Sequence, residues 1–522
     1  MFRPDVIRLP FSHLFSNYPL RGNQVKRWYK WITVSAFSLV FLSLQAQEFS
    51  GGLEWDDEAY NAAPRLPQHE DSKNQTLPFQ IDLRPFCPPI RNQGTMYSCV
   101  GWAVGYGAMT IERALQNRWN DPKLIANEAS SALYLFSNIK LEDDCKRGAR
   151  ISDAVQFLVD EGNCLAREFD FDVNNCEQEV PPELRERAKQ AAIQDYVTLF
   201  DAQAPQRLKV IKTLQALSWR KPVVVGMEVR RNFYQLRQAQ YWWPEQGNTT
   251  PAGGHAMVVV GYDQGKQSFL LMNSWGTQWG DQGYIWVKYD DFGRFCKYAY
   301  VLDLGGRPSF QPVAMQTGMP APAARPLLEL SGSFEFWAME GADANGPILR
   351  PASLSGQGPW YQMARRDWPL GQLFQLRATN KVQREYVYVF SVDPAGKVSI
   401  HWPRSAELDN RFQGINESPL LLGDGWQLIV PGKTKALKLT QAGTENLCVL
   451  FSAEKIKDIK AIAFQLSQSP DNWWVRLQQL LGNRMIPPVD VAFSGNDMSF
   501  KAQTRSGGYI VPLVLQVSSI EQ

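Results

Sequence analysis

A cysteine, a histidine and an asparagine in the first two thirds of the chain have the side chains needed for nucleophilic catalysis. Cys99 lies in the segment NQGTMYSCVGWA, where Gly94 predicts a turn and Ser98 predicts a helix N-cap, so Cys99 would begin a helix. The positive end of a helix stabilises a thiolate and lowers the pKa of a cysteine. A lone cysteine is more often a small buried side chain, so the assignment of Cys99 as a nucleophile depends on a base within reach.

The candidate base is His255, which falls in the same predicted domain as Cys99. It begins the apolar run HAMVVVGYD, directly after Gly254, whose lack of a side chain would let a substrate backbone approach. Asn273 ends the next predicted strand, so two neighbouring strands would place its amide beside the imidazole. The amide oxygen would accept a hydrogen bond from one ring nitrogen and leave the other nitrogen facing the thiol. The alternative is a structural histidine, which is less favoured once the cysteine and the asparagine are counted with it.

These segments resemble the active-site motifs of the papain-family (clan CA) cysteine peptidases. NQGTMYSCVGWA resembles the segment around the family's nucleophile, GGHAMVVVGYD its histidine strand, and NSWGTQWGDQGY its asparagine segment. The order of the four candidate residues, Gln93, Cys99, His255 and Asn273, is also the family's order. Three separated motifs agree between about residues 80 and 303, which makes a chance match implausible.

The resemblance implies a role for each of these residues. Cys99 would attack the scissile carbonyl as a thiolate, and His255 would pair with it and then protonate the leaving amine. Asn273 would fix the imidazole, and Trp275 would shield their hydrogen bond from water. The side chain of Gln93 and the backbone N–H of Cys99 would bind the oxyanion. The sequence has no Cys/His spacing typical of zinc, so no structural metal is expected. A thiol peptidase of this kind would also need no catalytic metal and no organic cofactor.

The chain also departs from the family's pattern. Close papain relatives carry a cysteine three residues before the nucleophile, where this chain has Met96, so their disulfide is not expected at this place. They carry tryptophan directly after the nucleophile, whereas here Val100 follows and the tryptophan is Trp102. Gly148 is the nearest candidate for the glycines that line the family's substrate cleft. These changes leave the chemistry intact and put the subsite preference in doubt.

Residues 1–46 are predicted to be a signal peptide. Three basic residues precede the uncharged run ITVSAFSLVFLSL: Lys26, Arg27 and Lys30. This apolar run is too short for a comfortable transmembrane helix, so a membrane anchor is the less favoured alternative, and no stable membrane span is expected after cleavage. We therefore expect a bacterial protein that is secreted or lies in the cell envelope. Polar residues 47–77 would form a loose leader, shorter than the family's helical prodomain, so no such prodomain is predicted.

The order of patterns predicts an α+β fold with several domains. Between residues 78 and 305 helical patterns come first and strand patterns follow, which fits a papain-like domain with a helical half and a β-barrel-like half. Residues 306–327 form a Pro/Ala-rich linker, and residues 328–522 look mainly β. In this last part, EYVYVFSVD and VSIHWP around PAGK predict a hairpin, and a helix is expected near 473–481.

The C-terminal region resembles, more weakly, a β-rich domain of unknown function found beside bacterial caspase-like peptidases. It shows no nucleophile and base pair, and His401 is interpreted as a packing residue. We expect this domain to bind an envelope component, a protein partner or the substrate. The formal net charge of the chain is +2, which gives no indication of binding to nucleic acid or to a membrane surface.

The seven cysteines fit an exported protein with some disulfides. Two of Cys145, Cys164 and Cys176 are expected to bond with each other. Cys87 and Cys296 lie near the two ends of the peptidase region, which could be neighbours in the fold, and Cys448 would be buried.

The leading functional hypothesis is an exported thiol endopeptidase that hydrolyses a peptide or protein substrate through an acyl-thioester. Two alternatives stay open. One is a non-catalytic module that binds peptides or envelope components on the same fold. The other is an acyl transferase that passes the acyl group from the same thiolate to an amine.

Overall fold

The computed structural model describes most of the chain from residue 50 onward. The described residues are 50–67, 77–142, 145–170, 172, 175, 177–245, 252–306, 327–343, 346–468, 472–495 and 497–521. The predicted signal peptide and residues 307–326 of the predicted linker lie outside these ranges. Within the described ranges, no helix has both the length and the apolar character needed to cross a bilayer.

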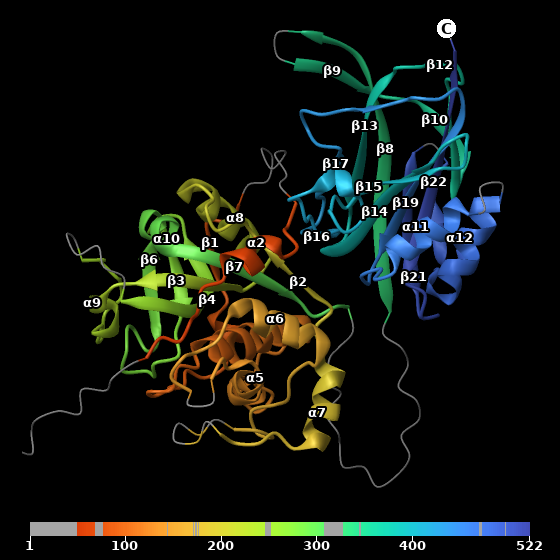
Figure 1. Cartoon of the computed structure of the whole chain (residues 1–522). Coiled ribbons are helices and arrows are strands. Elements are labelled where there is room, and N and C mark those ends of the chain that lie inside the picture. The colour runs from red at the N-terminus through yellow and green to blue at the C-terminus, as the bar shows by residue number, and fades with distance from the viewer. Residues whose placement is uncertain are drawn as a thin grey trace, which may run out of the picture. The chain divides into compact units, whose positions relative to one another are not determined.

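The helical half is built around the helix that follows Cys99. This helix begins with the π-helical segment η3 (Gly101–Met109), whose residues are all buried, and continues as α3 (Thr110–Gln116). Beside it lie α5 (Ala132–Ile139) and α6 (Ile151–Asp160), drawn in orange in Figure 1. The remaining helices of this half are α4 (Pro122–Asn127) and α7 (Pro182–Ala188). The side chain of Ser131 caps α5 by accepting from the N–H of Tyr134 at 3.0 Å.

Glycines let this central helix approach its neighbours closely. A Cβ on Gly101 would lie 2.5 Å from the carbonyl oxygen of Ala132 at the start of α5. We expect Gly101→Ala to destabilise the protein by about 1–3 kcal/mol, because this overpacking outweighs the gain in helix propensity. Chemical unfolding against a Gly341→Ala control, which has open space around the added methyl group, measures the difference. An unfolding free energy equal to that of the control would contradict the packing argument.

The second half of the domain is an antiparallel sheet. Its strands are β2 (Asp195–Thr198), β3 (Val223–Val229), β4 (Gly253–Asp263), β5 (Ser268–Met272), β6 (Tyr284–Lys288) and β7 (Cys296–Asp303), in the order β2-β7-β3-β4-β5-β6. The short β1 (Gln80–Asp82) pairs with β4. Helices α8 (Gln206–Ser218) and α10 (Tyr289–Phe295) pack together against this sheet, and α9 (Arg231–Tyr234) follows β3. The predicted α+β class is confirmed. The predicted order of helices before strands holds for α3 to α7, but β1 precedes these helices, and α8, α9 and α10 lie between the later strands.

Two further sheets make up the C-terminal region. One has the strand order β10-β11-β22-β19-β14-β15, and the other has the order β17-β13-β8-β21-β20. The first group is β10 (Leu354–Gln357), β11 (Trp360–Met363), β22 (Ile510–Ile520), β19 (Gly443–Ser452), β14 (Arg384–Val392) and β15 (Val398–Trp402), joined by β12 (Trp368–Pro369) and β16 (Leu420–Leu422). The second is β17 (Gln427–Val430), β13 (Leu373–Asn380), β8 (Leu328–Asp343), β21 (Met498–Thr504) and β20 (Val491–Phe493), joined by β9 (Gly346–Pro351) and β18 (Leu437–Lys438).

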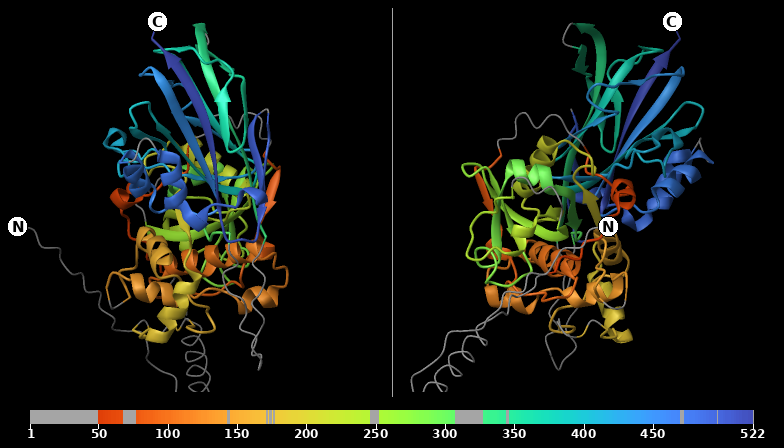
Figure 2. Two further views of the ribbon diagram at one scale, coloured as in Figure 1. Left: turned by 90° about the vertical axis from the view of Figure 1, so that its right-hand side faces the viewer. Right: turned by 60° about the vertical axis from the view of Figure 1, so that its left-hand side comes forward.

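Side chains from the two C-terminal sheets meet between them. Phe451 of β19 packs on Phe500 of β21, and Gly332 of β8 leaves room for the same Phe451 ring. Helices α11 (Ile459–Ser467) and α12 (Trp473–Leu481) lie together on the outside of the strands, as the blue helices in Figure 2 show. The predicted hairpin is confirmed as β14 and β15, and the expected helix near 473–481 is confirmed as α12.

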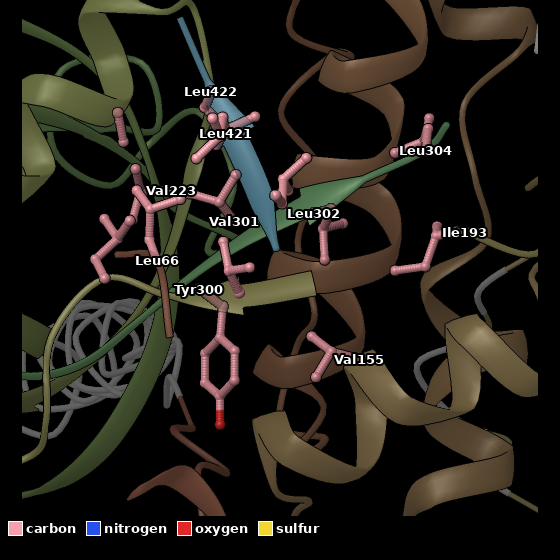
Figure 3. Packing of buried hydrophobic residues seen from close by; sticks show 14 of the residues in the cluster. Leu66, Val155, Ile193, Val223, Tyr300, Val301, Leu302, Leu304, Leu421 and Leu422 are labelled. Carbon is pink, nitrogen blue, oxygen red and sulfur yellow. The ribbon is translucent and has the colours of Figure 1, made fainter. Parts of the chain in front are cut away.

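Buried apolar side chains connect the C-terminal strands with the sheet of the first domain. Figure 3 shows Leu421 and Leu422 of β16 close to Val301 and Leu302 of β7, and all four are buried. They belong to one continuous hydrophobic cluster. The two regions therefore share core contacts.

Residues 50–67 are packed, so the expectation of a loose leader is wrong for them. They contain α2 (Asp57–Ala62), which Asp56 caps through its side chain. Tyr60 of this helix is fully buried, and its hydroxyl donates to the carbonyl of Phe200 at 2.7 Å. A charged, proline-containing sequence had suggested solvation, but one buried tyrosine and a capped helix hold the segment on the domain.

The cysteine predictions were wrong in part. Cys87, Cys164 and Cys296 are free thiols, so neither a Cys87–Cys296 bond nor any bond through Cys164 is present. Cys145 is disulfide-bonded, and Cys176 lies outside the described residues. Cys448 is a buried free thiol in β19, as expected.

Candidate active site

The nucleophile candidate lies where the helical half meets the sheet. Cys99 starts the central helix and is fully buried, and its Sγ accepts a hydrogen bond from the N–H of Ala256 at 3.4 Å. Because Ala256 follows His255 in β4, this contact places the sulfur against the backbone of β4 directly after the candidate base. Ser98 precedes the helix, but its Oγ has no hydrogen-bond partner among the described residues, so the predicted side-chain cap is not formed.

His255 and Asn273 are paired through the sheet. Val258 of β4 lies opposite Met272 of β5, which brings the two residues to the same end of this strand pair. The Nε2 of His255 lies 2.7 Å from Oδ1 of Asn273, and that oxygen also accepts from the N–H of Ser274 at 2.8 Å. Asn273 therefore selects the tautomer in which Nε2 carries the proton. The other ring nitrogen, Nδ1, is buried with no hydrogen-bond partner in the described part of the chain, so it is available to take a proton.

Trp275 and Gln93 complete the set. The Trp275 ring stacks on the His255 ring with a centroid distance of 4.3 Å and an interplanar angle of 22°, and both are buried. Gln93 is also buried, and its Oε1 accepts from the hydroxyl of Ser274 at 2.6 Å. That bond fixes the orientation of the Gln93 amide, whose Nε2 donates to the carbonyl of Met96 at 2.8 Å. The structure thus brings five predicted positions together: Cys99, His255, Asn273, Trp275 and Gln93.

Comparison with known proteins agrees with this arrangement. The sequence model described as papain family cysteine protease matches residues 77–300. These residues form a papain-family domain. An uncharacterized peptidase C1-like protein of Acanthamoeba polyphaga mimivirus is 26% identical over 206 residues, which cover 38% of this chain and 63% of that protein. Cathepsin S of Bos taurus is 28% identical over 229 residues, which cover 42% of this chain and 63% of cathepsin S. The chain thus spans less than two thirds of the length of these relatives.

Among solved structures, xylellain, a cysteine protease from Xylella fastidiosa, aligns over 50% of this chain and 98% of its own chain. The sequence identity is 21% and the TM-score is 0.43.

The candidate active site is covered by a segment of the same chain, residues 50–55. The carbonyl of Ser50 accepts from Nε2 of Gln93 and from Nε1 of Trp275, each at 3.1 Å. It therefore occupies Gln93 Nε2, one of the two donors predicted to bind a substrate oxyanion. We call residues 50–55 the covering segment.

The covering segment bridges both halves of the papain-family domain. The N–H of Leu53 donates to the carbonyl of Gly254 at 3.4 Å, and the N–H of Ala149 donates to the carbonyl of Gly52 at 3.0 Å. The backbone of Gly254 thus does admit an extended chain, as its lack of a side chain suggested, but the chain is the protein's own. Gly148 also lies against this segment, since a Cβ there would be 2.1 Å from the oxygen of Gly52.

The covering segment was not predicted from the sequence. Its only signal was the pair Gly51-Gly52, within a stretch interpreted as loose. Gly52 has φ +117°, and a Cβ on it would lie 2.1 Å from the carbonyl oxygen of Tyr97. Only glycine fits this close approach of two backbones.

Burial sets the protonation state of the covered site. Burial raises the pKa of the Cys99 thiol to about 12, although backbone N–H donors, that of Ala256 foremost, favour the thiolate. Burial lowers the pKa of His255 to about 4, and the bond to Asn273 opposes that shift only partly. At neutral pH both groups are therefore uncharged. The expected lowering of the Cys99 pKa by the helix is wrong for this covered state, because desolvation outweighs the helix end.

Proposed function

We propose that the protein is an exported cysteine endopeptidase that uses Cys99, His255, Asn273 and Gln93. The observation that carries the proposal is the hydrogen-bonding state of His255. One ring nitrogen, Nε2, is hydrogen-bonded to Asn273, and the other, Nδ1, is buried without a partner in the described ranges. The next residue along the strand, Ala256, donates its backbone N–H to the Cys99 sulfur. A base that is oriented and unoccupied beside a thiol is the arrangement that activates a cysteine nucleophile.

The chemistry follows from these positions. His255 takes the thiol proton at Nδ1, and the Cys99 sulfur attacks the scissile carbonyl. The oxyanion is bound by Gln93 Nε2 and by the backbone N–H of Cys99. The imidazolium then donates its proton to the leaving amine, which leaves an acyl-thioester on Cys99. Water, deprotonated by His255, attacks this thioester and releases the acid and the thiol.

The export part of the proposal is supported by the basic and apolar pattern of residues 26–46. Sequencing the N-terminus of the protein collected from the envelope and the medium tests it, and a new terminus near residue 47 is expected. A protein that retains residues 1–46 in the cytoplasm would refute export and leave the chemistry untouched.

Labelling by an epoxide affinity probe for papain-type thiols tests the catalytic proposal. The probe is applied to the wild type and to Gly52→Ala, in which the added methyl group prevents the covering segment from packing against Tyr97. Mass spectrometry maps the labelled sites. We expect labelling at Cys99 in the substituted protein and its loss when His255→Ala is added. A folded Gly52→Ala protein with an accessible Cys99 that alkylates slowly and hydrolyses no peptide would favour the binding-module alternative. Product analysis with an added amine separates hydrolysis from acyl transfer.

Gln93 gives a separate prediction. In the Gly52→Ala background, Gln93→Ala should lower kcat roughly a hundredfold, about 3 kcal/mol, because a donor aimed at the oxyanion acts mainly in the transition state. Steady-state kinetics on a fluorogenic peptide measure this, with exposed Gln362→Ala as the matched control. A change confined to KM would show that Gln93 binds substrate and does not stabilise the oxyanion.

A further inference from the structure

A cavity lies where the ends of α3, α8 and β7 meet the start of β14. Its volume is about 510 Å³, which is within the range of small-ligand sites. None of the candidate catalytic residues is among its described lining residues. Four cationic and two anionic side chains line it: Arg118, Arg220, Lys221, Arg384, Glu112 and Asp303.

Both carboxylates of this cavity are already neutralised by cations of its own wall. Lys221 Nζ donates to Oε2 of Glu112 at 2.8 Å. Arg384 donates to both carboxylate oxygens of Asp303. The two arginines that follow α3 and α8 are therefore left without a carboxylate in the cavity wall.

These two arginines have no anionic partner elsewhere in the described ranges. Neither Arg118 nor Arg220 forms an ion pair or a side-chain hydrogen bond there, and the Arg220 guanidinium lies over the Phe86 ring, 5.0 Å from its centroid. The ring fixes the Arg220 guanidinium without reducing its charge. The cavity thus has two positive charges that its surroundings do not neutralise.

Both arginines also hold a backbone conformation that is uncommon for a residue with a side chain. Arg118 follows the end of α3 with φ +55°, and Arg220 follows the end of α8 with φ +61°. Glycine is the usual residue at this place after a helix, because it adopts the left-handed conformation without strain. A cation near a helix C-terminus is favourable, but it has the same effect from the last turn without that strain. Strained positions of this kind cluster at functional sites, so two of them beside one cavity indicate a use for the arginine side chains.

Two buried polar atoms of the lining residues have no hydrogen-bond partner in the described part of the chain. They are Oε1 of Glu112, an acceptor, and Nε1 of Trp219, a donor whose ring packs on Trp426 at 4.9 Å. Buried polar groups are nearly always hydrogen-bonded, so this acceptor and this donor indicate a partner that the protein itself does not supply. A hydroxyl group can donate to the carboxylate and accept from the indole N–H.

From these observations we propose that the cavity binds a small hydroxylated anion, whose charge is carried by a phosphate or a carboxylate group. Arg118 and Arg220 would bind the anionic group, since a planar guanidinium suits either one. The hydroxyl groups would bind Glu112 Oε1 and Trp219 Nε1. This site is additional to the proposed peptidase activity and does not depend on it.

Calorimetric titration of the full-length protein with glycerol 3-phosphate and with glycerate, at constant ionic strength, tests the site. The cavity variant is Arg118→Gln/Arg220→Gln, and the matched control is Arg185→Gln/Arg207→Gln. All four arginines are exposed, and the control pair lies outside the cavity. We expect saturable one-site binding of at least one probe to the wild type and the control, with Kd at least about tenfold higher in the cavity variant. The probe with the lower Kd identifies the anionic group. Failure of both probes to saturate the wild type, or equal Kd values in the two variants, would overturn the proposal.

Trp219→Phe tests the hydroxyl contact separately, because it keeps an aromatic ring and removes only the N–H donor. We expect the Kd of the bound probe to rise about fivefold, with exposed Trp243→Phe outside the cavity as the matched control. An unchanged Kd in Trp219→Phe would overturn the assignment of a hydroxylated ligand.

Discussion

Gly52→Ala should expose Cys99 and raise its rate of alkylation by iodoacetamide by about a hundredfold or more. A Cβ at this position would collide with the backbone of Tyr97, so the covering segment must leave the site. Water then reaches the thiol, and its pKa falls from about 12 toward the ordinary value of about 8.5. That change alone increases the thiolate fraction near pH 7 roughly a thousandfold. Peptide mapping of alkylated cysteines over time measures the rate.

The protein carries internal controls for this experiment. Cys164, Cys296 and Cys448 are buried free thiols outside the covering segment, so they should stay protected in the substituted protein. Gly341→Ala, with no atom within 4 Å of the added methyl group, serves as the matched substitution. A rise at all four cysteines would indicate unfolding, and a Cys99 rate equal to that in Gly341→Ala would show that the segment does not control access.

The candidate catalytic residues could be predicted because each lies in a short sequence motif that determines the local backbone conformation. The helix start at Cys99 and the strand ends at His255 and Asn273 each depend on a few neighbouring residues. Their register then follows from the antiparallel pairing of β4 and β5. The Ser274 bond that orients Gln93 connects residues 181 positions apart, and no local pattern encodes it.

What the sequence did not predict depends on contacts between distant segments. Residues 50–67 are polar enough to suggest solvation, yet Tyr60 is buried and Ser50 binds Gln93 and Trp275. The pKa of Cys99 was expected to fall because the positive end of a helix stabilises a thiolate. The helix start could be predicted because it depends on neighbouring residues only. The burial of Cys99 is tertiary, and desolvation has the larger effect.

A buried ion pair between the two regions was likewise not predicted from the sequence. Asp303 ends β7 with an almost fully buried carboxylate, and Arg384 begins β14. Arg384 donates to both oxygens of Asp303 and, at 2.7 Å, to the carbonyl of Ala453, while Tyr386 also donates to Asp303. Burial raises the pKa of Asp303. The Arg384 guanidinium, with smaller contributions from other donors, lowers the pKa by more than burial raises it, so the pKa of Asp303 lies below its ordinary value. The carboxylate is therefore charged and depends on Arg384.

Arg384→Met should cost about 3–5 kcal/mol of unfolding free energy, because it leaves a buried carboxylate without its cation. Urea unfolding followed by tryptophan fluorescence measures the loss. Arg350→Met is the matched control. Its ion pair with Glu340 is largely exposed, so its removal should cost at most about 1 kcal/mol.

The double variant Arg384→Met/Asp303→Asn decides whether charge is the cause. If the loss in Arg384→Met comes from an uncompensated carboxylate, removing that charge restores much of the stability, since a buried pair contributes little beyond satisfying its own members. If the loss comes from packing, the second substitution adds to it, because Tyr386 then faces an amide in place of its carboxylate acceptor. Recovery would show that the uncompensated carboxylate of Asp303 causes the loss, and that Arg384 matters at the junction of β7 and β14 because it neutralises that charge.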